Sequence, residues 1–474
     1  MTTESVAALG ANTTPDPAAS VDIPAIVAGL RQTYATGRTR DLQWRQRQLL
    51  ALAQAMEENE TAIAKALEAD LGRKPFEAWL ADSVGTIAEA KDAAKNLHKW
   101  AKRRYRLLER SQLPGRGWVE YEPYGTVLII GAWNFPFYLT LGPLVGALAA
   151  GNTVVLKPSE IAPASSRLMV DLVERYLDTD AITVVEGDGM VSQELIAQGF
   201  DRIMFTGGTE IGKKIMAAAA PHLTPVTLEL GGKSPVIVAA DADIDVAAKR
   251  IAFAKVINSG QICVAPDYVV AEKPIRDQLV TKIRDAIEAF TADDADGLPI
   301  VSERQFNRLN SYLGGCGGEV VTGGGTDAGK LTIQPTVVVD PALDGPLMTE
   351  EIFGPILPVI TVDSLDDAIR FVNARPKPLA AYLFTKAKAV RERVIREVPA
   401  GGMLVNHLIF QVSTTRLPFG GVGPSGMGAY HGRYGFLEFS HSKSVMTKPT
   451  RPDLSKLVYP PYTDKAWKLA RKFF

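Results

Sequence analysis

The spacing of hydrophobic residues predicts a helical N-terminal region. From about residue 23 to residue 108, apolar positions recur every three or four residues, as on the buried face of a helix. Asp41 stands where it would cap the start of one helix, and Gly72 where it would end the next. The apolar residues that mark these helices are Leu49, Ala53, Met56, Ile63, Leu67 and Leu71. A further apolar stretch at 139–150, interrupted by glycine and proline, predicts a buried helix.

From about Tyr124 the pattern changes to short apolar runs separated by helical stretches. Because successive positions are apolar, both faces of each predicted strand are buried. Such runs, alternating with helices, are typical of a mainly parallel sheet covered on both sides, whose ligands bind at the carboxyl ends of the strands. The runs lie at 127–130, 153–156, 182–185, 203–205 and 226–228, with helical stretches at 164–176 and 210–220.

A second α/β unit begins near Gly231. Helices are expected at 244–256 and 275–290, and strands at 268–270 and 336–339. Residues 314–325 are rich in glycine and predict a surface loop with a small hairpin. Residues 416–435 are also dense in glycine, so several positive φ angles are expected there. That segment carries too much apolar surface to be a plain linker.

Composition excludes several classes of protein. Lys and Arg total 52 and Asp and Glu total 53, a net charge of −1 that lacks the basic footprint of a nucleic-acid-binding protein. Two cysteines, Cys263 and Cys316, and five histidines show no metal-binding spacing. No apolar run is long enough to span a membrane. Residues 1–20 resemble no secretory signal, which favours a flexible tail in a reducing cytoplasm.

The last ten residues, 465–474, are basic and amphipathic. Such a segment can lie on a membrane surface, but a helix docked on the protein is the favoured interpretation.

Cys263 is the first candidate nucleophile, because it follows a polar turn that contains Gly260. The chain has only one other cysteine, Cys316. Glu229 ends an apolar strand at a glycine pair. A thiol and an isolated carboxylate, both expected at strand-to-loop transitions, suggest covalent catalysis with release by a general base. The alternative is that Cys263 is a buried packing residue, as free cysteines often are.

Three further segments carry weaker signals. Residues 202–212 predict a strand, a glycine turn and a helix. The turn would present its N–H groups to a phosphate, or it is an ordinary connection between strand and helix. Lys157 and Glu160 follow a strand and can hold a ribose, or be a solvated charge pair. Asn134, between aromatic residues, can donate its amide to an oxyanion, or simply form a turn.

Together these segments closely resemble the aldehyde dehydrogenase superfamily, from about residue 42 to residue 442. Flanking residues at 223–228, 264–268 and 425–432 look like the class 3 branch, which includes fatty, aromatic and bacterial coniferyl aldehyde dehydrogenases. The matching stretches are 133–136 (WNFP), 157–160 (KPSE), 205–207 (FTG), 229–233 (ELGGK), 260–263 (GQIC), 350–355 (EEIFGP) and 418–421 (PFGG).

The resemblance implies an α/β fold with a Rossmann-like, doubly wound NAD-binding domain, an α/β catalytic domain and a small β oligomerisation element. The expected divisions are a tail at 1–20, the NAD(P)-binding domain at 21–229 with a bridging strand at about 115–124, the catalytic domain at 230–430, and an oligomerisation segment at 431–474. The bridging strand is expected to pair 119–122 with 440–446 and to join a homodimer.

The resemblance also assigns roles. Cys263 would attack the aldehyde, the Asn134 amide and the Cys263 N–H would hold the oxyanion, and Glu229 would activate water to hydrolyse the thioester. The residues implied in cofactor binding are Lys157, Glu160, Thr206, Gly207, Gly208, Gly212, Glu351 and Phe353; no metal is implied.

The expected activity is NAD(P)-dependent oxidation of an aldehyde to its acid in the cytoplasm. The substrate would be aromatic, such as coniferyl aldehyde, or a medium- or long-chain aliphatic aldehyde, with Trp133, Phe137 and Phe410 hinting at an apolar site. Glu229 favours hydrolysis over the alternative, a CoA-acylating semialdehyde dehydrogenase. Glu160 favours NAD, because its charge opposes a 2′-phosphate, while the class 3 likeness also admits NADP. A binding protein without turnover and an esterase are further alternatives.

Overall fold

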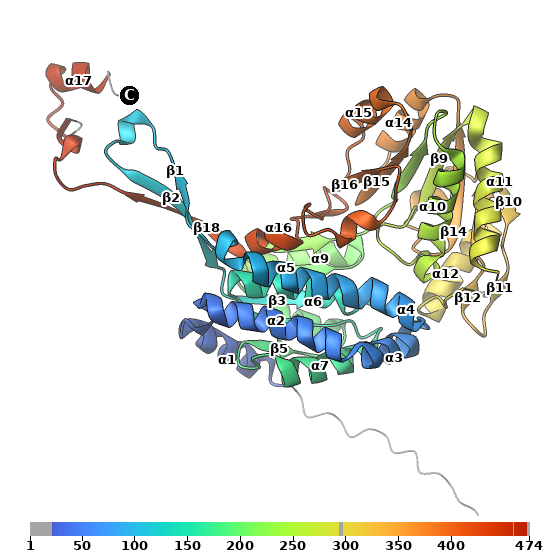
Figure 1. Ribbon diagram of the computed structural model, residues 1–474, viewed down its shortest axis with the longest axis horizontal. Helices are drawn as coiled ribbons and strands as arrows, with labels where there is room; N and C mark the ends of the chain where they lie inside the picture. The colour runs from blue at the N-terminus through green and yellow to red at the C-terminus, as the bar shows by residue number, and fades with distance from the viewer. Residues whose placement is uncertain (1–20, 293–296, 458, 472–474) are drawn as a thin grey trace, which may run out of the picture.

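The computed structural model describes residues 21–292, 297–457 and 459–471, so the tail expected at 1–20 lies outside the described residues. The described chain forms two mainly parallel sheets, each with its own helices, and a narrow three-stranded arm (Figure 1). The arm projects away from both sheets, and the last helix lies beyond it.

The first sheet has the strand order β17-β7-β6-β3-β4-β5. All its strands are parallel except β17, which pairs antiparallel with β7. Its central strands are buried on both faces, as their continuous apolar runs predict. The bounds are β3 Thr126–Ile130, β4 Thr153–Lys157, β5 Ile182–Val184, β6 Arg202–Thr206, β7 Val226–Glu229 and β17 Gly426–Met427.

Helices cover both faces of this sheet. Val127 and Ile129 of β3 pack in one core cluster with α2, α5 and α6, whereas Leu128 packs on the opposite face with α1, α8 and α9. Asp41 caps α2 through its side chain, and Gly72 ends α3 with a φ of 70°, as predicted. The bounds are α1 Ile23–Ala35, α2 Leu42–Glu58, α3 Glu60–Leu71, α4 Pro75–Ala78, α5 Val84–Trp100, α6 Tyr138–Ala150, α7 Pro163–Tyr176, α8 Gly189–Ile196 and α9 Thr209–Ala219.

The second sheet has the order β10-β13-β14-β9-β8-β15-β16, and only β10 runs antiparallel to its neighbour among the strands described. The strands are β8 Pro235–Val238, β9 Tyr268–Glu272, β10 Glu319–Thr322, β13 Thr336–Val339, β14 Ile356–Val362, β15 Ala380–Phe384 and β16 Gly402–Val405. The helices are α10 Ile244–Val256, α11 Lys273–Phe290, α12 Glu303–Gly314, α13 Pro346–Thr349, α14 Leu365–Asn373 and α15 Lys388–Glu397.

The expectation of a surface loop at 314–325 is wrong in part. Residues 319–322 form the edge strand β10, and the small hairpin lies further along, between β11 Thr326–Asp327 and β12 Thr332–Ile333. The strand has only four residues and is flanked by glycines, so the sequence pattern there is typical of a loop. The prediction of positive φ angles at 416–435 is confirmed, at Gly423, Gly426, Gly428, His431 and Gly432.

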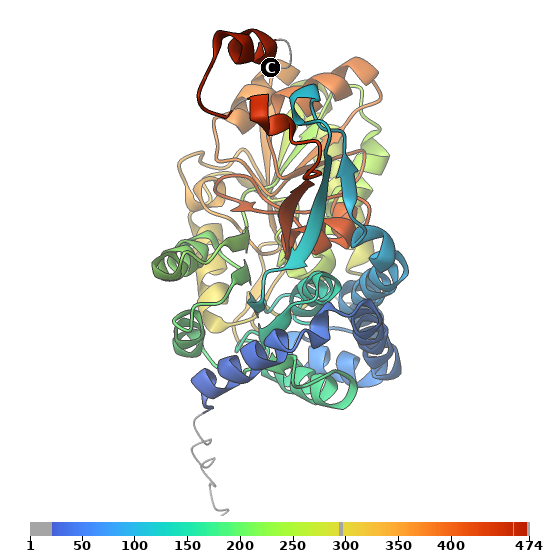
Figure 2. The same cartoon turned by 90° about the vertical axis from the view of Figure 1, so that its left-hand side faces the viewer.

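The arm consists of β1 Arg104–Arg106, β2 Arg116–Pro123 and β18 Ser440–Thr447, and it faces the viewer in Figure 2. The predicted pairing of 119–122 with 440–446 is confirmed, with Val119 opposite Ser444. The helical prediction up to residue 108 is wrong after Trp100, because β1 pairs with β2 at a distance that local periodicity cannot reveal.

The C-terminal helix α17, Asp464–Ala470, packs against the 3₁₀ turn η7, Leu454–Leu457, beyond the end of the arm (Figure 1). The expectation that it docks on the protein body is wrong in this chain, since Trp467 keeps 60% of its surface exposed. Among the residues described, no helix combines the length and apolarity needed to cross a membrane.

Candidate active site

The predicted site residues meet where the carboxyl edge of the first sheet faces the amino edge of the second. Glu229 is the last residue of β7, and Asn134 follows β3. Cys263, by contrast, lies in the loop between the 3₁₀ turn η5, Ile257–Gly260, and β9. The expectation that Cys263 stands at the end of a strand is therefore wrong, because its loop leads into a strand.

The backbone before Cys263 turns through three successive left-handed residues. Asn258, Ser259 and Gly260 have φ values of 51°, 49° and 69°. A Cβ on Gly260 would lie 2.3 Å from the carbonyl oxygen of Gly354, so only glycine fits there. Two non-glycine residues in this region cost conformational energy, and such strain persists where the surroundings impose it.

Asn134 is 3% exposed and contacts this same loop. Its Nδ2 donates to the carbonyl oxygen of Gln261 at 3.1 Å, two residues before Cys263. The amide has two N–H groups, and only one is used in this contact. The structure thus brings the predicted amide donor beside the predicted nucleophile.

A buried ion pair holds the two loops together, and sequence reasoning missed it. Arg73 and Asp82 are 1% and 0% exposed and bind each other. Arg73 also donates to the backbone oxygen of Asn134 and to Asn258 Oδ1, the latter at 3.2 Å. Asp82 accepts hydrogen bonds from the backbone N–H groups of Phe137 and Tyr138, each 3.0 Å long. Nothing in the local sequence marks this pair, because its partners lie far along the chain.

The Cys263 thiol is enclosed by protein although the residue retains some exposed surface. Burial raises the pKa of Cys263 to about 12, and the charges of Glu351 and Glu229 act in the same direction. The N–H groups of Cys263 and Val264 oppose this shift. At neutral pH the isolated chain therefore holds a thiol rather than a thiolate.

Glu229 is 3% exposed, and neither of its carboxyl oxygens has a hydrogen-bond partner among the described residues. Burial raises its pKa well above the usual range, and the charge of Glu438 adds to the effect. A buried carboxyl without a partner is costly in a folded protein. Such a group is expected where chemistry requires it.

The Glu351 carboxyl lies against the glycine pair that follows Glu229. A Cβ on Gly231 would come within 2.0 Å of Glu351 Oε2, and the backbone N–H of Gly232 bonds the carboxylate. Burial raises the pKa of Glu351 to about 7, and Asp267 adds to the rise. Gly231 thus leaves room for the Glu351 carboxyl, and Gly232 supplies it with a backbone donor.

The loop that carries Glu351 is anchored from outside. Arg308 donates to the backbone oxygens of Glu351 and Ile352 at 3.1 and 2.7 Å. Phe353 has a φ of 47° and makes an edge-to-face contact with Trp133, with ring centroids 5.5 Å apart. Phe353 and Trp133 therefore bring the two sides of the site together.

Lys157 ends β4 and is 2% exposed, and its Nζ donates to Glu160 Oε2 at 2.8 Å. The Glu160 side chain is 47% exposed. The pair is therefore only half solvated: a buried lysine is paired with a carboxylate that reaches solvent.

The strand, turn and helix around Thr206 form as predicted. Thr206 ends β6, and its Oγ1 is buried without a partner in the described chain. The Gly207 N–H donates to the backbone oxygen of Glu229 at 3.0 Å, and Gly208 caps α9 with open space where a Cβ would be. At Gly212 a Cβ would lie 2.6 Å from Leu230, so this glycine serves helix packing.

Comparisons with known proteins agree with this geometry. A family model described as the aldehyde dehydrogenase family matches residues 12–445. The chain is 43% identical over 456 residues to an aldehyde dehydrogenase of Craterostigma plantagineum, covering 95% of both chains. It is 42% identical over 455 residues to aldehyde dehydrogenase family 3 member A2 of Rattus norvegicus, covering 94% of this chain and 93% of that one.

A solved structure, the substrate-bound state of Staphylococcus aureus AldH, superposes with a TM-score of 0.91 at 40% identity, covering 95% of this chain and 99% of that one. The chain belongs to the aldehyde dehydrogenase family. As an aldehyde dehydrogenase it is an NAD(P)-dependent enzyme that oxidises an aldehyde to a carboxylic acid. The relatives that it matches include class 3 members, as the motif flanks predict.

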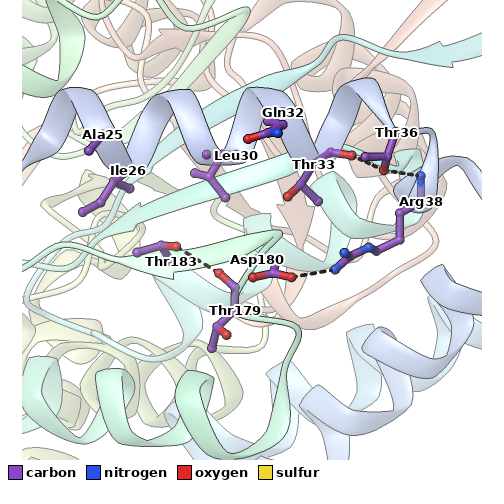
Figure 3. Close-up of a pocket in the computed structure, with 11 residues that line it drawn as sticks. Ala25, Ile26, Leu30, Gln32, Thr33, Thr36, Arg38, Thr179, Asp180 and Thr183 are labelled. Atoms are coloured by element: carbon purple, nitrogen blue, oxygen red, sulfur yellow. Dashed lines mark hydrogen bonds and ion pairs between the residues drawn. The ribbon is translucent and has the colours of Figure 1, made fainter.

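This aldehyde dehydrogenase also has a groove of about 450 Å³ between α1 and the segment entering β5 (Figure 3). Arg38 on one side of it binds Asp180 on the other, and α1 supplies most of the lining. None of the predicted site residues lines this groove, so it is separate from the site described above.

Proposed function

We propose that Cys263 is the nucleophile of this aldehyde dehydrogenase and that Glu229 is the base that releases the acid. The observation that carries the proposal is the buried Glu229 carboxyl, which has no hydrogen-bond partner among the described residues. It is close enough to the Cys263 thiol for its charge to add to the effect of burial, which raises the pKa of that thiol. In this mechanism the sulfur adds to the aldehyde carbon, and the thioester that follows is hydrolysed by water that Glu229 deprotonates.

The Asn134 amide and the Cys263 backbone N–H hold the oxyanion formed by addition of the thiol. Support comes from the second N–H of Asn134, which has no partner among the described residues, and from the hydrogen bond that joins Asn134 to the Gln261 backbone. Arg73 bonds both Asn134 and Asn258. It therefore holds the Asn134 amide in a fixed position relative to the loop that carries the nucleophile.

The dinucleotide is held by residues from both sheets. Three features fit polar groups of a nucleotide: the Thr206 hydroxyl, which has no partner in the described part of the chain, the open cap at Gly208 and the half-solvated Lys157–Glu160 pair. Gly207 and Gly212 shape this turn, and Glu351 and Phe353 are proposed to contact the nicotinamide end. NAD(P)⁺, when bound, supplies the hydride acceptor that converts the thiohemiacetal into the thioester.

For cofactor choice we infer a preference for NAD. The exposed Glu160 carboxylate would repel a 2′-phosphate, which supports NAD. A relative of Rattus norvegicus, 43% identical over 436 residues, is named a dimeric NADP-preferring aldehyde dehydrogenase. Measuring kcat/KM with both dinucleotides decides between them.

For substrate we infer an aromatic aldehyde, such as coniferyl aldehyde, or a medium- or long-chain aliphatic one. Trp133 is half-buried at the site and Phe410 is 53% exposed, which supports an apolar approach. Phe137 is fully buried in the core, so the hint that it lines the site is wrong.

We further infer a cytoplasmic homodimer. The strands β16 and β18 each end a sheet and leave one edge unpaired among the described residues. Such edges favour pairing with another chain, so we propose that β18 of one copy extends the second sheet of its partner at β16. Light scattering that finds only monomer would contradict this proposal.

The function is tested by following NADH formation with short, long-chain and cinnamyl-type aldehydes and identifying the product. A free acid supports hydrolysis at Glu229. An acyl-CoA product formed only with added coenzyme A would contradict it.

A further inference from the structure

A buried network links the strand that carries Glu229 to the helix α16, Gly432–Glu438. The carboxylate of Glu438 accepts from Thr227 Oγ1 at 2.7 Å and forms an ion pair with Arg202. Arg202 also donates to Thr227 Oγ1, at 2.8 Å. The side chains of Arg202 and Glu438 are only 10% and 17% exposed.

Thr227 and Glu229 project from the same face of β7. Side chains two residues apart on a strand share a face and lie roughly 7 Å apart along it. Leu228, between them, packs on the opposite face with α9. The Glu438 carboxylate, bound to Thr227, is therefore held on the same side of the sheet as the carboxyl of Glu229.

The neighbouring backbone makes room for this arrangement. Gly428 has a φ of 85°, and a Cβ there would lie 2.2 Å from Glu438 Oε1 and 2.7 Å from Thr227 Cγ2. Gly426, two residues earlier, pairs directly with Glu229 in β17. The strand that flanks Glu229 is thus built to admit the second carboxylate.

We propose that Glu438 is a positioning residue that sets the pH at which Glu229 can accept a proton from water. Arg202 stabilises the charge on Glu438 and holds it in place, and Thr227 adds one hydrogen bond. That charge opposes ionisation of Glu229 and makes its carboxylate a stronger base once it forms. The proposal rests on the role of Glu229 proposed above.

Two other titratable groups lie near Glu229. Burial is the main cause of the raised pKa values of Tyr430 and Cys263, and the charge of Glu229 adds to both shifts. Burial remains the main cause of the raised pKa of Glu229, and Glu438 adds to it. Removing Glu438 should therefore move the titration of Glu229 without abolishing it.

The test measures the slow phase of product release after the NADH burst as a function of pH in the intact enzyme. In wild type this rate should rise with pH as Glu229 ionises. Glu438→Gln should shift that rise to lower pH by about half a unit or more, because one opposing charge is gone. Glu438→Met should shift it in the same direction, which keeps the test open if one variant folds poorly.

Two controls separate this role from a structural one. Glu438→Asp keeps the charge, and Thr227→Val removes only the hydroxyl; both should leave the rise within about 0.2 units of wild type if charge is what matters. A rise that stays in place, or moves to higher pH, in Glu438→Gln and Glu438→Met overturns the proposal. If Glu229→Gln itself keeps the rise, the function proposed for Glu229 fails instead.

Discussion

The predicted site residues lie at the carboxyl ends of the strands in the first sheet and at the amino ends in the second. In the first sheet, Lys157, Thr206 and Glu229 are the last residues of their strands. In the second sheet, Cys263 and Glu351 lie in loops that lead into β9 and β14. The rule that ligands bind at the carboxyl ends of parallel strands therefore describes the first sheet only.

The difference has a geometric reason. The chain passes from β7 directly into β8 through the short Gly231–Gly232 turn, so the second sheet starts where the first one ends. The candidate site residues lie between a carboxyl edge and an amino edge. In the mechanism proposed above, one edge supplies the base and the other the nucleophile, so variants of each should fail differently.

The largest effect is expected from Cys263→Ala, which disables the second edge. Aldehyde oxidation should fall by roughly a thousandfold or more, and the NADH burst should vanish, because no covalent adduct forms. Stopped-flow absorbance of NADH measures both. A retained burst would show that the nucleophile lies elsewhere.

Glu229→Gln disables the first edge and should leave the burst intact. The slow phase should fall by about a hundredfold or more, because water loses its base while addition of the thiol continues. Mass spectrometry of the quenched protein should detect acyl-enzyme on Cys263. Equal loss of burst and slow phase would mean that the two edges do not divide the reaction as proposed.

Arg73→Met removes the cation that joins the two edges. It leaves the buried carboxylate of Asp82 unpaired, so the free energy of unfolding should fall by about 3–5 kcal/mol. Lys91→Met, at an exposed pair with Glu57, is the control and should cost less than about 1 kcal/mol. Urea unfolding measures both, and equal effects would contradict the bridging role.

Variants of Gly208 and Gly212 distinguish a role in packing from a role in dinucleotide binding at the first edge. Gly212→Ala meets Leu230 and should lower stability by about 1–2 kcal/mol. Gly208→Ala meets nothing and should change stability by less than about 0.5 kcal/mol while raising KM for the dinucleotide several-fold. Thermal melting and steady-state kinetics distinguish the two, and a destabilised Gly208→Ala would refute the assignment.

The smallest effect is expected at Glu351, whose charge acts on the thiol of Cys263. The pKa of Glu351 is about 7, so its carboxyl is charged at alkaline pH and there opposes formation of the Cys263 thiolate. Glu351→Gln should therefore speed alkylation of Cys263 by iodoacetamide a few-fold at alkaline pH. The difference should shrink below neutral pH, where Glu351 holds its proton. An unchanged rate would show that burial alone controls the thiol.

Elements with strong local patterns were predictable. The five parallel strands of the first sheet begin and end within two residues of their apolar runs, because burial on both faces leaves continuous apolar sequence. The edge strands β1 and β10 were missed, since each has few residues and gains its pairing from a distant segment. The position of α17 was misjudged because amphipathicity does not say which surface a helix meets.

The sequence by itself determined which chemical groups this aldehyde dehydrogenase has, in motifs that surround Cys263, Glu229, Asn134 and Glu351. Only the tertiary structure decided that Cys263 precedes a strand while Glu229 ends one, and that Arg73 and Asp82 join their loops. The reason is that a motif records neighbours along the chain. Burial and charge act between atoms close in space, so the pKa of Glu229 depends on Glu438, which is 209 residues away (438 − 229).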